Sequence, residues 1–552
     1  MEQRKGEIHA TLLYLSGSPR QIGRTHGAAA RAAGALECVK FFGDFLDHAF
    51  RFQVRGSAAR LSRNFFRRLV GEEIEKSFID KIPRRYRESL EGFSEGSGLP
   101  LQQLLRAYVM PDVYAYLLGR RFLWFRTPPM EPIVVGCTSG VGFSDPKARE
   151  GLIHLRNLDY PSGSEWASFP TIAEYAPDDG QRYVSVTSLG VETAGITAMN
   201  EAGLTLSLHM NYSRCVSTGG LPVVAMGHEV IRQATTLDAA IRILGSFPKG
   251  GGWSVVLTSF KERNAVVAEF DSKRFSLRGL DRNFLAATNH FLDPELQTHE
   301  YWITPGRKLD SEARLRRLTE LLSSGNPPLN SSRAAKILAD SRDPFLERDR
   351  SFGNTISQAH TVSSVVLDPA ERILYIACGA PPVSKRAFRA YRCFSLSLYS
   401  DHAIEGESQG PKMEAREWYA KAYDAYFPKN DLLTAEDCLR QATALESTES
   451  LYWFMLALVQ MKRQDFHAAT RSLEEAQRVP DIHYRTSQCT LFLARLLDLS
   501  QKRREAIEIY KTLGRDPLWG PRARRGMRRA FSLRDVQRVV LDFMIGDAID
   551  RS

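Results

Sequence analysis

A cysteine that directly follows a glycine lies well inside the chain, in the stretch Val134-Val135-Gly136-Cys137-Thr138. A thiol placed there can reach the carbonyl carbon of the preceding residue, and Gly136 leaves that carbonyl open because it has no side chain. After an N-to-S acyl shift and hydrolysis, Cys137 would become N-terminal. Its new α-amino group, with an ordinary pKa of about 7.7 to 8, would then serve as a base for the thiol. The stretch predicts a nucleophile that first cleaves its own chain between Gly136 and Cys137; the alternative is a buried cysteine at a strand start.

A second motif with catalytic potential is the G-x-S-x-G of serine hydrolases, which occurs at Gly92-Phe93-Ser94-Glu95-Gly96. That motif requires a strand before the serine and a helix after it. Here a helical pattern precedes the serine and Gly98-Leu99-Pro100 follows it. We therefore interpret Ser94 as part of a helix C-terminus and not as a nucleophile.

Length and composition indicate a globular protein of several structural units. The chain has 552 residues, 43% of them hydrophobic, which predicts three or four units at about 150 residues per domain. Its seven cysteines are odd in number and scattered, which suits reduced thiols better than a disulfide framework. We find no signal-peptide pattern at the N-terminus and no apolar run of the roughly 18 residues that a membrane span needs. We expect a cytoplasmic protein without a transmembrane segment.

The formal net charge of +10 raises the question of an anionic partner. The excess is concentrated in two clusters, Arg60 to Arg87 and Arg522 to Arg538, in which arginines alternate with apolar residues at helical spacing. Such a pattern is typical of a solvated basic helix face that packs on one side. No recognised nucleic-acid-binding module accompanies the charge, so we do not expect a nucleic-acid partner.

The pattern of apolar and turn residues changes near residue 136 and again near residue 400. Residues 1–136 begin with a short strand-like run and continue as mostly helical sequence. Residues 137–400 consist of short β-rich runs separated by turn residues, with helical patterns at about 223–244 and 311–322. Strands that are followed by helices and then by strands again predict an α+β fold with helices packed on antiparallel sheets.

Residues 401–413 are interpreted as a linker, and residues 414–552 as helical throughout. The same small and apolar positions recur 34 residues apart, where Ala435, Leu439 and Ala442 match Ala469, Leu473 and Ala476. This period resembles tetratricopeptide repeats, which usually offer a concave surface to a peptide or a partner protein. The alternative is a generic helical bundle.

Several motifs, taken in order, resemble one group of enzymes. They are Gly17-Ser18-Pro19, Ile22-Gly23-x-x-His26-Gly27, Gly136-Cys137-Thr138, Arg156-Asn157-Leu158-Asp159, Asn200-Glu201-x-Gly203-Leu204 with Asn211, Asn289, and Ser311-x-x-Arg314. They cover roughly residues 10 to 395 and are similar to cysteine N-terminal-nucleophile (Ntn) hydrolases of the self-cleaving penicillin acyl-coenzyme A acyltransferase type (peptidase family C45), with choloylglycine hydrolases as relatives. The resemblance implies two stacked antiparallel sheets between helical layers, an αββα sandwich.

The resemblance also implies roles for single residues. Arg156 would lie near the thiolate of the nucleophile and lower the thiol pKa, and Asp159 would lie near the new α-amino group. Asn211 would donate to the tetrahedral oxyanion. Asn289 would hold the α-amino group and help to place the acyl carbonyl, and Arg314 would reach the site from a helix.

Four of these residues also have a purely structural alternative. Arg156 and Asp159 could be ordinary charges at a strand end, Asn211 a turn residue, and Arg314 part of a solvated basic helix face. Positions three apart on a straight strand point to opposite faces, so the functional interpretation of the first pair requires the strand to end or twist before Asp159.

The sequence thus predicts acyl transfer through a thioester on Cys137, with an acyl amide or an acyl-coenzyme A as the substrate and either water or an amine as the acceptor. No motif implies a metal, nucleotide or flavin cofactor, and the oligomeric state is left open. The competing hypothesis is an adaptor that binds partners through its helical repeats and has an inactive front region. Because all candidate site residues precede the linker, we expect the front region to work without the repeats.

Overall fold

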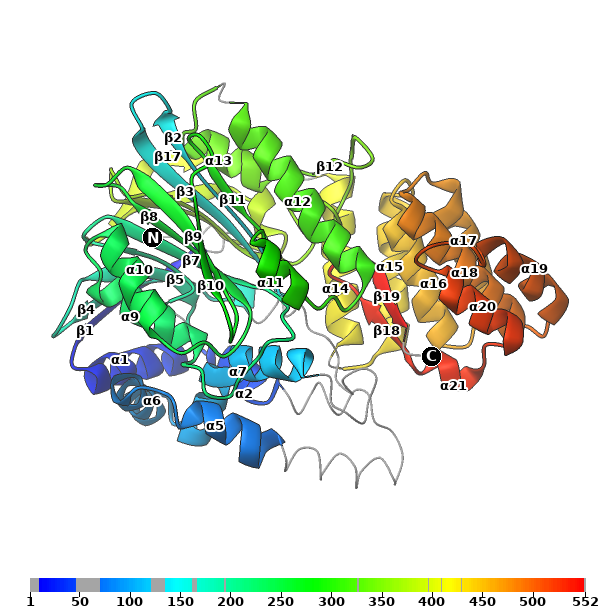
Figure 1. Ribbon diagram of the computed structural model, residues 1–552, viewed down its shortest axis with the longest axis horizontal. Helices are drawn as coiled ribbons and strands as arrows, with labels where there is room; N and C mark the ends of the chain where they lie inside the picture. Colours follow the sequence, from blue (N-terminus) through cyan, green and yellow to red (C-terminus); the bar gives the residue numbers. More distant parts are fainter. Residues whose placement is uncertain are drawn as a thin grey trace.

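The computed structural model describes residues 9–45, 70–120, 135–160, 166–192, 195–324, 327–395, 397–408, 410–427 and 429–550. Two stacked β-sheets lie between layers of helices, and a separate group of helices follows on one side (Figure 1). The predicted α+β class and the αββα layering are confirmed.

The first sheet has eight strands, and all neighbours in it are antiparallel except the first pair, which is parallel. Turn residues join its hairpins as predicted, with Gly180 and Gly203 at positive φ, the region that glycine adopts without strain. In sheet order the strands are β1 (Thr11–Gly17), β4 (Pro170–Pro177), β5 (Tyr183–Ser188), β6 (Thr197–Asn200), β7 (Leu204–Met210), β8 (Trp253–Ser259), β9 (Asn264–Phe270) and β10 (Phe275–Gly279).

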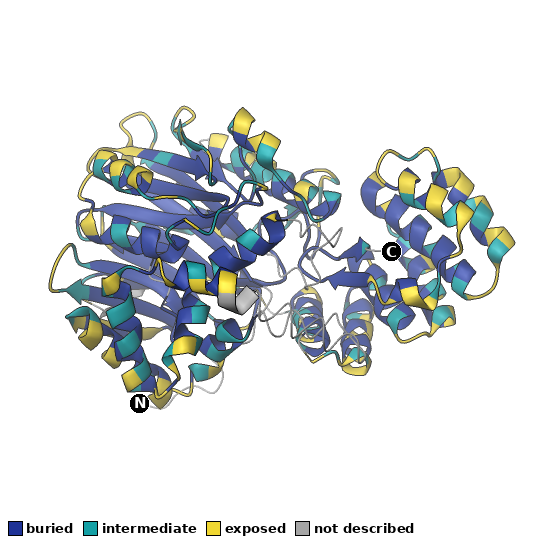
Figure 2. Cartoon of the chain, turned by 60° about the horizontal axis from the view of Figure 1, so that its bottom comes forward, coloured by how far each residue is buried: buried dark blue, intermediate teal, exposed yellow. Residues whose placement is uncertain are grey.

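The second sheet has seven antiparallel strands and contains the predicted nucleophile at the start of its second strand. Both faces of its central strands are covered, so their residues are buried almost without interruption (Figure 2). In sheet order the strands are β11 (Leu285–Ala287), β2 (Gly136–Asp145), β3 (Glu150–Asp159), β14 (Thr361–Asp368), β15 (Ile373–Ala377), β16 (Phe388–Arg392) and β17 (Ser397–Ile404).

Helices cover the outer face of each sheet (Figure 1). The first sheet carries α1 (Pro19–Ala32), α9 (Val223–Gln233) and α10 (Leu237–Ser246). A further layer packs on these helices: α6 (Arg84–Ser97) on α1, α7 (Leu101–Gly119) on α6 and α9, and α2 (Leu36–Gly43) on α7. The second sheet carries α12 (Pro305–Ser323) and α13 (Ser331–Leu338).

Two helix predictions need correction in detail. The helix expected at 223–244 is divided into α9 and α10, because Thr236 caps a new helix with its side chain. The helix expected at 311–322 already begins at Pro305, where Thr304 caps it and proline occupies the first turn.

Glycines set the contact between α1 and α6. A Cβ at Gly92 would overlap the carbonyl oxygen of Arg20, and one at Gly27 would overlap that of Phe93, so the two backbones touch. Ser94 lies in the last turn of α6, which ends at Gly98 in the left-handed conformation. The interpretation of Ser94 as part of a helix C-terminus is confirmed, and Gly92 of the G-x-S-x-G motif serves helix packing.

Helices also form most of the region after the second sheet, where consecutive helices pack in pairs. All six repeat positions are buried: Ala435, Leu439, Ala442, Ala469, Leu473 and Ala476. The repeat class itself stays a prediction. The helices are α14 (Pro411–Tyr426), α15 (Leu432–Leu445), α16 (Ser450–Lys462), α17 (Phe466–Arg478), α18 (His483–Leu499), α19 (Arg503–Leu513), α20 (Gly520–Arg528) and α21 (Leu533–Val536).

The prediction of helix throughout residues 414–552 is wrong near its end. Residues Val539–Asp542 form β18 and Asp547–Asp550 form β19, which pair as an antiparallel hairpin. Gly546 has a φ of 62° in the connection, and the β-branched pair Val539 and Val540 favours strand. At the other boundary, β17 runs to Ile404 and so takes up the start of the predicted linker.

The sandwich and the helices after it share a continuous core. The rings of Phe352 and Tyr419 stack with their centroids 4.2 Å apart. Beside them, Arg350 is buried and forms ion pairs with Asp343, Glu449 and Asp481, two of which belong to the helical region. These contacts are those of a domain interior, not of a flexible junction.

Several arginines of the two basic clusters form ion pairs within the described residues. Residues 60–69 of the first cluster lie outside the described residues; within the rest, Arg85 pairs with Asp179. In the second cluster, Arg522 pairs with Asp550 and Arg529 with Asp535. Within the described ranges, no helix combines the length and the apolar character needed to cross a membrane.

We predict that Gly92→Ala destabilises the protein by about 1–3 kcal/mol, because the added methyl group must push α1 away from α6. Gly279→Ala is the control, since a Cβ at that position meets no atom within 4 Å. Urea unfolding monitored by circular dichroism measures both. A Gly92→Ala protein as stable as the control would show that the two helices are not in backbone contact.

Candidate active site around Cys137

The pairing of β2 with β3 brings Cys137 and Arg156 to the same face of the sheet. Cys137 lies opposite Leu158, and Ser139 lies opposite Arg156, so the arginine is the diagonal neighbour of the cysteine. Arg156 Nη2 donates to Cys137 Sγ at 3.5 Å. The guanidinium is held by the carbonyl oxygens of Ile196 and Leu208. Both side chains are buried between the two sheets.

Burial controls the protonation of the thiol. The pKa of Cys137 is raised above its usual range by burial, and the positive charge of Arg156 opposes this rise only in part. The structure therefore places Arg156 where the resemblance implies, but the net shift is opposite to the one expected. In the uncut chain the thiol is neutral at physiological pH and needs a base.

Asp159 approaches the same strand end from the other face. It lies opposite Gly136 in the ladder, and its partner strand β14 has an irregular register between Thr361 and Ser363. β3 does not end before Asp159, so Arg156 and Asp159 do point to opposite faces. They nevertheless flank the same bond, because one reaches the thiol and the other reaches the glycine before it.

One carboxylate oxygen of Asp159 is left without a hydrogen-bond partner. Thr361 Oγ1 donates to Oδ1 at 2.6 Å, while Oδ2 is buried and has no partner among the described residues. A Cβ at position 136 would lie 2.8 Å from this Oδ2, so only glycine fits there without a shift. Burial raises the pKa of Asp159 to about 6.

Asn289 and Arg314 converge on the backbone of Cys137. The backbone N–H of Cys137 donates to Asn289 Oδ1 at 2.7 Å. Arg314 Nη1 donates to the Cys137 carbonyl oxygen at 2.6 Å, and its Nη2 donates to Asn289 Oδ1 at 3.0 Å. Arg314 is buried and pairs with Asp310, so it is not part of a solvated helix face.

Asn211 is buried directly after β7, but no contact in the described structure joins it to Cys137. Its Nδ2 donates to Ser254 Oγ at 2.6 Å, and its Oδ1 has no partner within the described residues. An amide turned by 180° would accept from Ser254 and leave Nδ2 as the group without a partner.

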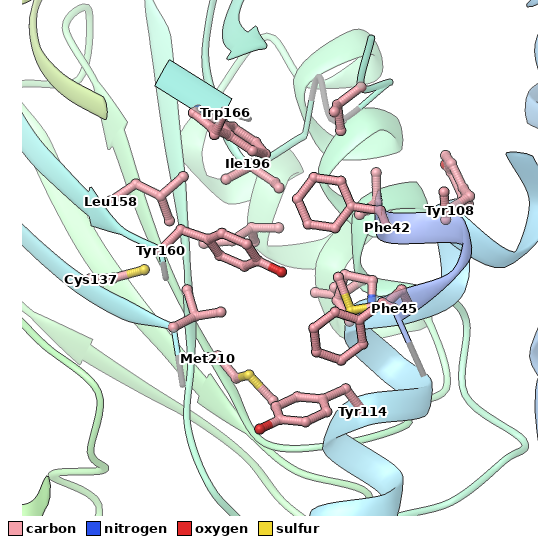
Figure 3. A pocket seen from close by; sticks show the side chains of 18 of the residues that line it. Phe42, Phe45, Tyr108, Tyr114, Cys137, Leu158, Tyr160, Trp166, Ile196 and Met210 are labelled. Carbon is pink, nitrogen blue, oxygen red and sulfur yellow. The ribbon is translucent and has the colours of Figure 1, made fainter. Parts of the chain in front are cut away.

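The thiol opens onto an apolar pocket of about 90 Å³ (Figure 3). Aromatic rings face the sulfur across it, from α2 and the residues after it and from α7. They are Phe42, Phe45, Tyr108 and Tyr114, and Trp166 and Met210 complete the wall. This apolar and aromatic lining suits a hydrocarbon chain and not a charged group.

The position of α7, which contributes Tyr108 and Tyr114, is fixed by a contact with α9. Asp112 of α7 accepts the first backbone N–H of α9, from Val223, at 3.0 Å.

Comparison with known proteins finds one family match in the chain. Residues 147–382 match the family described as acyl-coenzyme A:6-aminopenicillanic acid acyl-transferase. This segment, less than half of the chain, is similar to that family. The match begins after Cys137, so the predicted nucleophile lies outside it.

Individual relatives are distant. Protein dcd1B of Dictyostelium discoideum is 20% identical over 250 residues, which are 43% of this chain and 46% of that protein, so the chain spans about half of its length. A Caenorhabditis elegans N-acylethanolamine-hydrolyzing acid amidase ortholog is 18% identical, with a TM-score of 0.30 over 42% of this chain and 93% of its own. A mutant conjugated bile acid hydrolase of Clostridium perfringens is 11% identical, with a TM-score of 0.33 over 49% of this chain and 97% of its own.

A polar network that no sequence motif indicated joins the two sheets behind Cys137. Ser139 Oγ shares hydrogen bonds with Ser207 Oγ at 3.0 Å and His209 Nε2 at 2.8 Å, and His154 bridges Ser207 to Thr205. Burial lowers the pKa of His154 to about 3 and that of His209 well below its usual range, so both rings are neutral. The alternation of polar residues at 205, 207 and 209 is the signal that could have revealed it.

One cluster among the residues that the structure describes could offer three metal ligands. Atoms of Cys215, Asp271 and His299 lie within 4.8 Å of one another. Asp271 Oδ2 already accepts from Ser213 Oγ at 2.8 Å and shares a hydrogen bond with His299 Nδ1 at 2.7 Å. None of the three lines the pocket of Cys137.

We predict a pH-dependent penalty from Asp159 in the uncut chain. Its folded pKa of about 6 exceeds the ordinary 3.8, so the stability of the protonated form is lost as pH rises from about 4 through 6. In a Cys137→Ala background, Asp159→Asn removes this loss. Between pH 4.5 and pH 7 its free energy of unfolding should gain about 2 kcal/mol relative to the parent.

Urea titrations at the two pH values measure this difference. The exposed Asp349→Asn in the same background is the control and should change stability equally at both. If Asp159→Asn also shifts stability by the same amount at both pH values, the carboxyl group is not buried as described.

Proposed function

We propose that this chain is a self-processing cysteine Ntn acyltransferase or amidohydrolase, cut between Gly136 and Cys137, which forms a thioester on Cys137 from an acyl amide or acyl-coenzyme A. The observation that carries the proposal is the different surroundings of the Cys137 thiol and of the backbone beside it. The thiol faces an apolar pocket, and the backbone N–H of Cys137 donates to Asn289 Oδ1. The preceding Gly136 lies against an Asp159 carboxylate oxygen that has no hydrogen-bond partner among the described residues.

Self-cleavage requires a proton to leave the thiol and a proton to reach the amide nitrogen. Sγ attacks the carbonyl carbon of Gly136, the C–N bond breaks, and the nitrogen of Cys137 leaves as an amine that carries the thiol proton. Asp159 is the proposed proton carrier, because its pKa of about 6 allows both forms near neutrality. Water then hydrolyses the thioester and leaves Gly136 as a carboxylate.

Cleavage would supply the base for the thiol that the uncut site lacks. The new ammonium group of Cys137 would find two acceptors, Asn289 Oδ1 and Asp159 Oδ2, and the second of these has no other partner among the described residues. In its neutral form this amine would take the thiol proton during turnover, and Arg156 would stabilise the thiolate.

Turnover then follows the same chemistry on a substrate. The thiolate attacks the acyl carbonyl, the amine or thiol of the substrate leaves with a proton, and water or an acceptor amine takes the acyl group. The apolar pocket favours a substrate with a hydrocarbon acyl chain. Asn211 is the proposed oxyanion donor, with its amide turned so that Ser254 donates to Oδ1 and Nδ2 is free to donate.

The remaining assignments extend this proposal to the whole protein. The catalytic core is residues 137–400 with 1–136 as the upstream fragment, followed by a linker at 401–413. Residues 414–552 are proposed to bind a protein or peptide partner. Seven free cysteines suit a cytoplasmic location.

Self-cleavage is tested by intact mass after expression. We predict two fragments from the wild-type protein, one ending at Gly136 and one beginning Cys-Thr-Ser-Gly. Cys137→Ala should stay whole and form no acyl-enzyme with any N-acyl amino acid or acyl-coenzyme A, whereas Cys215→Ala, the control thiol, should be cut as the wild type is. Active wild-type protein that is a single uncut chain would refute the mechanism, and absence of any acyl-enzyme would favour the adaptor hypothesis.

The oxyanion role is tested separately on protein that has been cut. We predict that Asn211→Ala lowers kcat/KM by about 100-fold, because one donor to the oxyanion is lost. Ser254→Ala should have a smaller effect, since it removes only the anchor of that amide. Equal activity of Asn211→Ala and the wild type would remove Asn211 from the site.

A further inference from the structure

The hairpin β18–β19 lies between the sandwich and the helical region (Figure 1). Toward the sandwich, Asp542 accepts two hydrogen bonds from the guanidinium of Arg307, and Asp547 Oδ2 accepts from Thr304 Oγ1 at 2.8 Å. Toward the helices, Tyr484 donates to the same Asp547 oxygen at 2.9 Å. A Cβ at Gly306 would overlap this carboxylate, so the hairpin is seated against the first turn of α12.

The tip of the hairpin reaches the bond that we propose to be cut. Met544 and Ile545 line a small cavity of about 20 Å³ together with Gly136 and Asp159. Other residues of the site that line it are Asn289 and Arg314. Both tip residues are buried, and Arg485 of α18 fixes them because it donates to the carbonyl oxygens of Ile545 and Gly546.

We propose that the tip of the hairpin β18–β19, Met544 and Ile545, and the side chain of Asp542 are part of the self-processing machinery. The tip closes the cavity beside the Gly136–Cys137 bond, and Asp542 positions α12. This inference rests on the proposed function. It assigns to the helical region a role at the site itself, in addition to the proposed binding of partners.

The size and lining of the cavity fit one water molecule. About 10–15 Å³ of such volume accommodates a water, which needs two to four polar partners. Asp159 Oδ2 faces this space without a partner among the described residues, and Arg314 and Gln358 line it. A water held there is the reactant that thioester hydrolysis requires. Its oxygen bonds to the Gly136 carbonyl carbon and one of its protons passes to Asp159; the C–S bond then breaks, and the sulfur takes the other proton as Gly136 becomes a carboxylate.

The base of the hairpin acts through α12. Arg307, Ser311 and Arg314 lie on successive turns of one helix face, and the last two touch Asn289 and Cys137. By fixing Arg307, Asp542 holds the helix that brings Arg314 to the nucleophile. The expectation that the front region works without the helical region is therefore reversed in this proposal.

The test uses full-length protein made by cell-free synthesis, with the cut fraction followed by intact mass from pH 5 to pH 8. Met544→Ala opens the cavity. Leu541→Ala is the matched control, because Leu541 is equally buried in the same hairpin but does not line the cavity. Met544→Leu restores the volume, and thermal melting of each variant measures the loss of stability.

We expect Met544→Ala to slow self-cleavage by at least about tenfold, because bulk water replaces the positioned water. Its pH midpoint should move below that of the wild type, because hydration lowers the pKa of Asp159 toward its ordinary value. Leu541→Ala should keep the wild-type rate and midpoint at a similar loss of melting temperature, and Met544→Leu should recover the rate.

Two other outcomes overturn the inference in different ways. If wild-type protein is cut but Met544→Ala and Leu541→Ala cannot be distinguished in rate and midpoint, the hairpin only supports the fold and the proposed function stands. If wild-type protein is never cut, both proposals fail.

Discussion

A buried carboxyl group set against the backbone of a glycine is the constraint on which this site depends. Asp159 is fully buried, and the carboxylate oxygen that faces Gly136 lacks a partner among the described residues. Such a group costs free energy, so the surrounding structure must enforce its position. The irregular pairing of β14 and the hydrogen bond from Thr361 do so, and any larger residue at 136 would collide with it.

The sequence predicted those features that depend on residue type and on the pattern of neighbouring residues. Gly136-Cys137 identified the strand start, turn residues identified the hairpins, and the failed serine motif was recognised from the helical pattern around it. The sequence could not show that Arg156 and Asp159 approach one bond from opposite faces of a sheet, because that depends on cross-strand register. Nor could it show that burial outweighs Arg156 at the thiol, since burial is a property of the assembled layers.

The features that were hardest to predict from the sequence are contacts between segments far apart in the chain. The hairpin at 539–550 follows a strongly basic helix, and nothing local indicates that its tip lies beside Gly136. The link between Ser139, Ser207 and His154 depends in the same way on how two sheets stack. For Asn211, the resemblance gave a role that the described contacts neither supply nor prevent, because the amide can be turned.

Segments on both sides of the proposed cut build the apolar pocket at Cys137. Phe42, Phe45, Tyr108 and Tyr114 all precede Gly136 in the chain, and so does β1, which completes an edge of the first sheet by pairing with β4. Cleavage would leave one sheet and one pocket shared by two polypeptides. Folding is unimolecular only before that cut; afterwards, recovery from unfolding would require two separate chains to meet. The mature protein would then persist through slow unfolding, and its lifetime would depend on a rate and not on an equilibrium.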